Sequence, residues 1–286
     1  MISVIMPIFN QYCELDIVLR YFAKQTIKAE FEIILVDDFS TDCRKEILGK
    51  YQDLNIKYLR NDKNRGRAFS RNVAIENSTG EYLIFCDCDR IPTENFIEDH
   101  MNVIDSNKAV ISIGKVTETY EHVQKLTMQA TPIPRRKAIY YNTISKIYNV
   151  SGKTDSCLCW LSTLSGNMAI KKSTLSDCRF SNEFKEWGFE HFELGYQLWK
   201  RRVQYILNAK AENIHIAHSR NKNFYHENIV KSHSIFYEKH RTKEIFYLKE
   251  FMLGEISLQE YEIKIDGPKK WMKMENNPII LKQINF

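Results

Sequence analysis

The sequence of 286 residues lacks the long apolar run, about 20 residues, that a membrane-spanning helix needs. Its apolar start, residues 2–9, has no cationic flank and contains Pro7, so it is predicted to be a β-strand and not a secretion signal. Only ten glycines occur, and neither GxGxxG nor GxxxxGK[ST] is present. These absences argue against a dinucleotide-binding or P-loop phosphate cradle, so any bound phosphate must be neutralised by other groups.

Cysteine is present but does not form pairs with metal-site spacing. None of the seven cysteines belongs to a CxxC motif, and an odd number does not suit a disulfide framework. Cys86 and Cys88 lie in an apolar stretch, where free cysteine behaves as a small hydrophobe. Spacing alone gives little support to a redox or metal role for Cys157 and Cys159. We therefore expect a reducing, cytoplasmic setting.

Charge of one sign is not in large excess. Lys and Arg number 41 against 36 Asp and Glu, which gives a net charge of +5. This mild surplus tolerates anionic ligands such as nucleotides or lipid phosphates, but it does not indicate a partner nucleic acid. The composition is that of an ordinary globular protein, long enough for one large domain with or without a smaller C-terminal lobe.

The first 106 residues alternate between strand-like and helix-like patterns. Strands are predicted over 2–9, 31–36, 56–60 and 81–86, and helices over 12–24, 42–51, 68–77 and 94–106. This order predicts βαβ units and hence an α/β fold with a parallel sheet. Right-handed crossovers place the carboxyl ends of such strands at one edge, which is where ligands bind in open α/β sheets.

The remainder of the chain is less regular. From 115 to 163 the periodicity weakens, which indicates an irregular segment that could act as a lid or an acceptor loop. Its basic and aromatic run, 135–141, would suit a peripheral contact with the inner face of a membrane or a lipid-linked acceptor, and equally a solvated loop. A second ordered block spans 164–218. Residues 223–254 suggest one or two helices, and the last thirty residues suggest an irregular or docked extension.

Two carboxylates follow the fourth predicted strand. Asp87 and Asp89 are two positions apart, so both can reach one cation if the chain turns there. Mg²⁺ and Mn²⁺ bind oxygen ligands and commonly bridge protein carboxylates and substrate phosphates. A lone DxD is also an ordinary acidic turn, but its place after a buried strand at the functional edge favours the metal interpretation.

A basic stretch precedes the third predicted helix. From Arg60 to Arg67, and counting Arg71 one turn later, five basic residues stand against the single acid Asp62. Guanidinium groups and helix N-terminal amides could meet a diphosphate there. The alternative is a solvated basic loop, which is what most charge runs are.

Further candidates lie in the second ordered block. Glu190 and His191 start a predicted helix, where either could act as a general base for an acceptor hydroxyl and where a carboxylate also caps the helix. The pair His215 and His218 is nonspecific on spacing alone.

The first half of the chain resembles the family 2 glycosyltransferases, which have the GT-A fold, in four runs: ISVIMPIFN, EIILVDDFSTD, NRGRAFSRNVAI and STGEYLIFCDCD. The second half resembles the C-terminal segment of the β-1,4-galactosyltransferases and the chondroitin-polymerase-like enzymes, in SGNMAIKKS, WGFEHFELGYQLWKRR and IHIAHSRNK. The resemblance covers roughly 2–106 and 164–222. It implies a Rossmann-like, mixed and mostly parallel sheet flanked by helices, with a C-terminal helical extension.

This resemblance implies a division of the chain and roles for single residues in donor binding. A GT-A domain would span 1–222, with a nucleotide-binding half over 1–106 and an acceptor and catalytic half over 107–222, followed by the extension 223–286. The implied donor contacts are Pro7 and Phe9 beside the uracil ring, Asp38 at the nucleoside, Arg67 at the diphosphate, and Gly166 and Asn167 at the donor sugar.

The resemblance also implies a metal site and an acceptor loop. Asp87 and Asp89 match the DxD motif of the family, with Asp89 the more direct ligand, and His218 matches the histidine that completes the site. Trp187 and Gly188 match the acceptor-binding loop.

One position departs from the family pattern. The family has WGxED, in which the Asp is taken as the catalytic base, whereas this chain has His191 there. Either His191 is the base, since imidazole titrates near neutral pH, or Glu190 takes over, which we favour. A third interpretation is weak activity or an unusual acceptor such as a thiol, which needs little help from a base.

Together these features predict a metal-dependent hexosyltransferase that uses Mn²⁺ or Mg²⁺. The resemblance implies that it moves a sugar, with inversion, from UDP-hexose or UDP-N-acetylhexosamine to a glycan, lipid-linked or peptide acceptor. The alternatives are a pseudoenzyme that binds a nucleotide sugar or a glycan, a nucleotidyltransferase, and a zinc or redox protein built on the cysteines. A nucleotidyltransferase would normally show an N-terminal loop rich in glycine and lysine, which PIFNQ is not.

Overall fold

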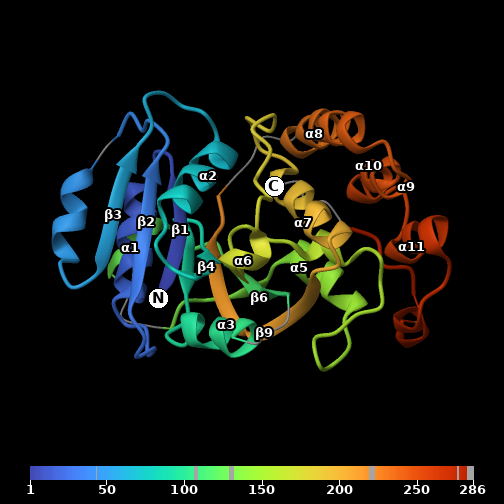
Figure 1. The fold of residues 1–286 in the computed structure, drawn as a ribbon, viewed down its shortest axis with the longest axis horizontal. Coiled ribbons are helices and arrows are strands. Elements are labelled where there is room, and N and C mark those ends of the chain that lie inside the picture. Colours follow the sequence, from blue (N-terminus) through green and yellow to red (C-terminus); the bar gives the residue numbers. More distant parts are fainter. Residues whose placement is uncertain (43, 106–108, 129–131, 219–222, 276, 282–286) are drawn as a thin grey trace.

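The computed structural model describes residues 1–42, 44–105, 109–128, 132–218, 223–275 and 277–281. Its strands form one sheet in the order β3-β2-β1-β4-β8-β6-β9-β5, with β7 paired to β6 (Figure 1). The strands are β1 Ile2–Ile8, β2 Phe31–Asp37, β3 Asn55–Arg60, β4 Tyr82–Phe85, β5 Arg90–Pro92, β6 Val110–Thr119, β7 Arg136–Lys137, β8 Met168–Lys171 and β9 Gln204–Ile216. Strands β1 to β4 are parallel, β8 is antiparallel to both of its neighbours, and β6 and β9 are parallel.

The first four strands lie where the sequence predicts them, to within one residue at each end. The helices of this half are α1 Tyr12–Phe22, α2 Arg67–Asn77 and α3 Phe96–Ile104. The predicted helix over 42–51 is wrong in type, because Lys45–Lys50 forms a 3₁₀ helix, η1, in which Ile47 is the buried side chain. A segment that buries so little apolar surface gains little tertiary support for a full α-helix.

The segment 115–163 is more regular than predicted. Strand β6 runs through its start, and β7 pairs with β6. The other elements here are α4 Val123–Met128, α5 Ile139–Ile144, and the 3₁₀ turns η2 Ser145–Ile147 and η3 Cys159–Ser162. Strand β6 is buried along nearly its whole length. Its sequence therefore lacks the alternation of apolar and polar residues by which a half-exposed strand is recognised.

The long strand β9 brings distant parts of the chain to one edge of the sheet. It follows β8, α6 Lys172–Leu175 and α7 Glu190–Lys200, and it runs parallel to β6 with a register shift between Gly114 and Lys115. Its far end pairs with β5, where Arg90 stands opposite His215. The turn that follows β4 therefore meets the end of β9.

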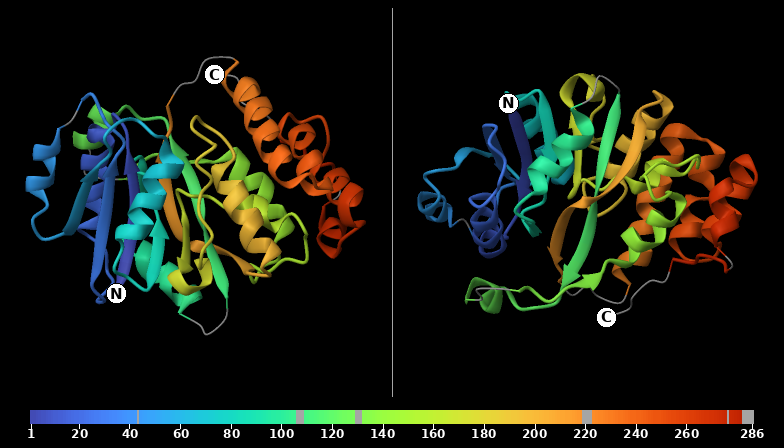
Figure 2. Two further views of the ribbon diagram at one scale, coloured as in Figure 1. Left: turned by 45° about the horizontal axis from the view of Figure 1, so that its top comes forward. Right: turned by 90° about the horizontal axis from the view of Figure 1, so that it is seen from below.

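The C-terminal helices pack on the α7 side of the molecule, away from the first strands (Figures 1 and 2). They are α8 Phe224–His240, α9 Lys243–Phe246, α10 Leu248–Met252, α11 Leu258–Asp266 and the 3₁₀ turn η4 Lys270–Met274. The ring of Trp160 in η3 makes edge contacts with Tyr196 of α7 and Phe236 of α8, at centroid distances of 5.4 and 5.9 Å. Helices α7 and α8 thus share one buried aromatic core.

Of the irregular or docked extension predicted for the last thirty residues, residues 258–266 are docked and helical, with Leu258 and Tyr261 buried. Ser257 accepts a hydrogen bond from the backbone N–H of Glu260, and the Glu260 carboxylate accepts one from the backbone N–H of Ser257. This capping box satisfies two amides that have no partner inside the helix, and α11 begins there.

Within the described residues, no helix is both long and apolar enough to cross a bilayer. The six cysteines of this part of the chain are unpaired, and Cys43 lies outside it. Burial raises the pKa of the Cys86 and Cys88 thiols well above the ordinary value, and it also raises the pKa of Cys157 and Cys159. Such thiols offer little thiolate for redox or metal chemistry.

Candidate active site

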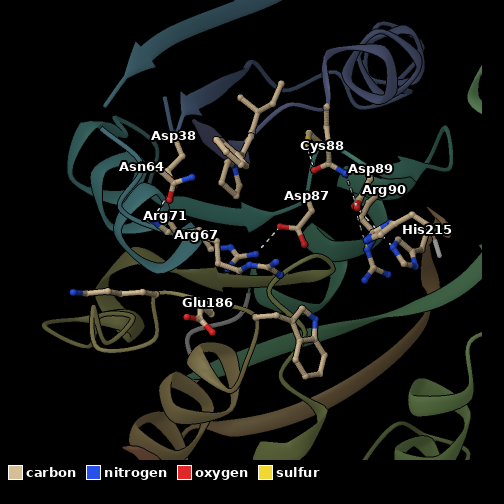
Figure 3. Close-up of a pocket in the computed structure, with 18 of the residues that line it drawn as sticks. Asp38, Asn64, Arg67, Arg71, Asp87, Cys88, Asp89, Arg90, Glu186 and His215 are labelled. Carbon is tan, nitrogen blue, oxygen red and sulfur yellow. Dashed lines mark hydrogen bonds and ion pairs between the residues drawn. The ribbon is translucent and has the colours of Figure 1, made fainter. Parts of the chain in front are cut away.

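A cavity of about 480 Å³ opens at the carboxyl ends of β1, β2 and β4 (Figure 3). One side is formed by residues that follow these strands, by the start of α2 and by the end of β9, and the other by the loop 185–188 and the start of α8. The lining residues are Pro7, Ile8, Phe9, Gln11, Asp38, Asn64, Gly66, Arg67, Arg71, Asp87, Cys88, Asp89, Arg90, Lys185, Glu186, Trp187, His215, His218 and Tyr225. The cavity therefore lies where ligands are expected in an open α/β sheet, at the carboxyl ends of its parallel strands.

Asp89, His215 and His218 form a group that could hold a metal ion. Their ligand atoms all lie within 4.8 Å of one another. The antiparallel pairing of β5 with β9 brings the first two together, so that His215 Nε2 lies 3.7 Å from Asp89 Oδ2. On its other side, His215 Nδ1 lies 3.7 Å from Glu118 Oε1, a carboxylate that can orient the imidazole.

The electrostatics of this group favour an ionised carboxylate. Burial acts to raise the pKa of Asp89, but His215, Arg90 and His218 outweigh it and hold the pKa well below the ordinary value. Gln11 Nε2 also donates a hydrogen bond of 3.3 Å to Asp89 Oδ2. One buried carboxylate and two imidazoles are a donor set that fits a divalent transition metal.

Of the three predicted metal ligands, Asp89 and His218 lie in this group and Asp87 does not. Asp87 Oδ1 instead accepts a hydrogen bond of 2.7 Å from Arg71 Nη2. Sequence reasoning missed His215 as a member of the group. The signal available was the HxxH spacing of IHIAH, and it was set aside as nonspecific. The residues Ser219 to Lys222 of the same motif lie outside the described part of the chain.

Arg71 of α2 links the turn after β4 to the start of α7. Its side chain is 1% exposed and stands between two carboxylates, with Nη2 on Asp87 and Nη1 at 3.1 Å from Glu190 Oε1. The ring of Phe180 lies 5.3 Å from the guanidinium carbon. Sequence reasoning placed Arg71 in the basic stretch but did not single it out, because its partner on α7 is 119 residues away.

The two candidate bases lie behind this bridge. Neither Glu190 nor His191 is among the lining residues. Burial acts to raise the pKa of Glu190, but His191, Arg67 and Arg71 outweigh it and lower the pKa to about 2. His191 Nδ1 lies 3.8 Å from Glu190 Oε2, and the imidazole is 18% exposed.

Asp38 lines the cavity and also holds its basic loop in place. Oδ1 accepts hydrogen bonds from Asn61 Nδ2 (2.7 Å) and the backbone N–H of Arg65 (2.9 Å), and Oδ2 accepts one from the backbone N–H of Gly66 (2.7 Å). Gly66 has φ 88°, and a Cβ there would lie 2.7 Å from the carbonyl oxygen of Lys185. Only glycine suits both the conformation and the close approach.

The remaining predicted donor contacts divide into two groups. Pro7, Phe9 and Arg67 line the cavity. Gly166 lies against it, since a Cβ there would meet Asp87 Oδ2 at 2.8 Å. Asn167 does not line the cavity: it is fully buried and accepts a hydrogen bond of 2.9 Å from His100 Nε2. Burial lowers the pKa of His100 to about 4, so the ring is neutral in this contact.

The predicted acceptor loop lies at the mouth of the cavity. Trp187 lines it and packs against Phe224 and Tyr225 of α8, at ring-centroid distances of 5.6 and 5.4 Å. Gly188 is closed in by α8, because a Cβ on it would overlap the Ser232 hydroxyl.

The chain is similar to known proteins, both to the model of a family and to single sequences. Residues 3–161 match the model of a family described as Glycosyl transferase family 2. Chondroitin synthase of Pasteurella multocida is 27% identical over 222 residues, which make up 70% of this chain and 23% of that protein. The chain spans between 23% and 65% of the length of the curated relatives that it matches.

Solved structures show the same fold. The crystal structure of Staphylococcus aureus TarS 1–349 in complex with UDP-GlcNAc superimposes with a TM-score of 0.63 at 22% identity, over 87% of this chain and 72% of that one. The mannosyltransferase PcManGT of Pyrobaculum calidifontis, in complex with GDP-Man and Mn²⁺, gives a TM-score of 0.57 at 14% identity, over 83% and 63%. This likeness confirms the predicted GT-A fold.

Proposed function

Because the chain belongs to glycosyl transferase family 2, as its motifs predicted, we propose that it transfers a sugar from a nucleoside diphosphate to an acceptor hydroxyl. The observation that carries this proposal is the convergence at one cavity of Asp89, His215 and His218 with the basic start of α2. A nucleoside diphosphate sugar needs such a combination, because its leaving group carries the negative charge.

The donor we propose is UDP-hexose or UDP-N-acetylhexosamine. TarS is solved with UDP-GlcNAc, and a chondroitin synthase is among the relatives. Pro7 and the 43% exposed Phe9 offer apolar surface for the base at the end of β1. Arg67 is the cation we place at the diphosphate, since its side chain lines the cavity and is 40% exposed. Arg71 is already neutralised by its two carboxylates.

A divalent cation fits the group at the end of β9. Asp89, His215 and His218 would hold it, and an oxygen and two nitrogens suit Mn²⁺ better than Mg²⁺, which prefers oxygen ligands alone. When bound, the cation supplies positive charge that stabilises the departing diphosphate. PcManGT is one structural neighbour that is solved with Mn²⁺.

His191 is the better candidate for the general base. A carboxylate with a pKa of about 2, such as Glu190, is a weak proton acceptor near neutral pH. Glu190 can instead orient the imidazole of His191 through its Nδ1 atom, as an acidic partner does in many catalytic pairs. We therefore propose His191 as the base and Glu190 as its positioning residue, the reverse of the preference based on sequence. Displacement with inversion follows by analogy with the family.

The experiment is a donor screen on the purified protein. Release of nucleotide from UDP- and GDP-sugars is measured in EDTA and after addition of Mn²⁺ or Mg²⁺, and the anomeric configuration of any product is determined by NMR. We expect turnover of a UDP-sugar that EDTA abolishes and Mn²⁺ restores. Full turnover in EDTA would exclude the metal role. Binding of UDP without any turnover would identify the alternative, a binding protein, which nothing in the described site or the comparisons favours.

A further inference from the structure

Helix α8 forms part of the cavity although it lies outside the segment that matches the family model. Tyr225, in its first turn, is a lining residue. The family model ends at residue 161, so this wall belongs to the part of the chain in which family members need not agree. In the ribbon, α8 lies beside α7 on the side away from β1 to β3 (Figure 1).

The loop 185–188 is fastened to α8 by contacts of three kinds. Glu186 Oε1 pairs with Lys231 Nζ at 2.6 Å. The ring of Trp187 packs against those of Phe224 and Tyr225. Ser232 Oγ lies 3.4 Å from the carbonyl oxygen of Trp187, to which it donates. The position of Trp187 over the cavity is therefore set by α8 and not by α7 alone.

The chemistry of this wall is amphipathic. Trp187 and Tyr225 present ring surface and polar edges, while Lys185 and Glu186 place charged groups around them. A hydroxylated ring has the same two-sided character, with C–H faces that pack on aromatic rings and hydroxyls at the rim that hydrogen-bond. A lipid chain would need continuous apolar surface, which the charged residues interrupt.

We propose that the acceptor is a saccharide and that Tyr225 of α8, together with Trp187, forms the platform on which its ring packs. This inference rests on the proposed transferase function and adds the class of acceptor and a specificity-determining residue. Tyr225 touches the acceptor and not the donor, because the donor elements lie across the cavity on β1, β2 and α2.

The test compares Tyr225→Ala, Tyr225→Phe and the control His226→Ala. His226 is the next residue on α8, is exposed and does not line the cavity. Acceptors are the p-nitrophenyl β-glycosides of glucose, galactose, N-acetylglucosamine and N-acetylgalactosamine, with the donor selected by nucleotide release. A serine- and threonine-containing peptide and a polyprenyl phosphate in detergent are the competing acceptors.

We expect the wild type to use at least one glycoside. Tyr225→Ala should raise the KM for it by about tenfold or more, since an aromatic anchor in a site carries a large share of binding. Tyr225→Phe, which keeps the ring, should have a lower acceptor KM than Tyr225→Ala, and the control His226→Ala should retain the wild-type KM for both acceptor and donor. A peptide or lipid preference, an unchanged acceptor KM in Tyr225→Ala, or an equal rise in donor KM would overturn the proposal.

Saccharide binding is also measured without turnover, by saturation-transfer NMR of the same glycosides in the presence of UDP and Mn²⁺. Absence of donor turnover together with glycoside binding that Tyr225→Ala abolishes would refute the proposed transferase function and leave the platform intact. Donor turnover with no glycoside binding would support the proposed transferase function and refute the platform.

Discussion

The two walls of the cavity are built in different ways. The wall with Asp89 and His215 is part of the sheet, and strand pairing between β5 and β9 sets its geometry. The wall with Trp187 is a loop whose position depends on packing against α8. The backbone ladder fixes the candidate metal group with little help from side chains, whereas the wall on which we propose that the acceptor packs can change whenever the supporting helix changes. A loop supported in this way is freer to vary than paired strands.

The largest effect should come from the sheet wall. Asp89→Ala removes the carboxylate of the metal group, and we expect transfer to fall by about a hundredfold or more, because charge on the leaving diphosphate is no longer offset. The stabilisation of the fold by Mn²⁺ in a thermal melt should disappear with it. Asp177→Ala, an exposed carboxylate in the loop before α7, is the control and should behave as wild type. A wild-type kcat in Asp89→Ala would show that the site has been misplaced.

The bridge that Arg71 forms between Asp87 and Glu190 should affect the free energy of unfolding most. Arg71→Met removes the closest cation, at 3.1 Å, from the buried Glu190 carboxylate and leaves only the more distant Arg67 and His191, which should cost about 3–5 kcal/mol. Adding Glu190→Gln removes the buried charge, so the double variant should recover part of this loss in urea unfolding. Arg201→Met breaks an exposed pair with Asp177 and should change stability little. A double variant no more stable than Arg71→Met would argue against the bridge.

The same bridge predicts a pH dependence. The pKa of Glu190 is lowered in the folded state from its ordinary 4.5 to about 2. Its contribution to stability is therefore complete above about pH 4.5 and is lost as the pH falls towards 2. The difference in unfolding free energy between wild type and Glu190→Gln should shrink across that window, and a constant difference would contradict it.

A smaller effect should come from the helix wall. A Cβ at Gly188 would overlap the Ser232 hydroxyl, so Gly188→Ala must push the loop away from α8, at a cost of about 1–3 kcal/mol. The KM for the acceptor should rise and the donor KM should not. Ser232→Gly makes room for the new methyl group, so the double variant should regain acceptor affinity. A loop held by α7 alone would show no such rescue.

The smallest expected change is a shift in the pH profile, and it concerns His191, the proposed general base. His191→Asp restores the residue that the family pattern has at this position. Because a carboxylate is a weaker base than an imidazole, the acid limb of the kcat profile should move to lower pH. His191→Gln should lose the base altogether. If His191→Asp and wild type share one profile, another group removes the proton.

The sequence allowed the strand ends at the cavity to be predicted, but not the contacts between segments that lie far apart in the chain. Asp87, Asp89 and Asp38 were located correctly at the cavity because strand ends of a parallel sheet meet at one edge, and local hydrophobic patterns reveal those strands. The place of His215 in the candidate metal group was missed because it depends on β5 lying antiparallel to β9, a pairing between segments more than 120 residues apart. Strand β6 was missed because a strand buried on both faces shows no alternation.

The roles of Asp87 and Asn167 were harder still to predict. Both positions match the family motif, yet Asp87 is paired with Arg71 and Asn167 is buried against His100. A motif identifies the residue but not the direction in which its side chain points, since that depends on which partners the rest of the fold supplies.

The three hydrogen bonds that Asp38 accepts from Asn61, Arg65 and Gly66 have a consequence for the kinetics of binding. They assemble the basic loop before any nucleotide arrives. Binding then requires little ordering of the backbone, so we expect the association rate constant to be set by diffusion and by attraction between opposite charges. It should fall as salt screens the arginines, and loosening the loop with Asp38→Ala should make association slower and less sensitive to salt.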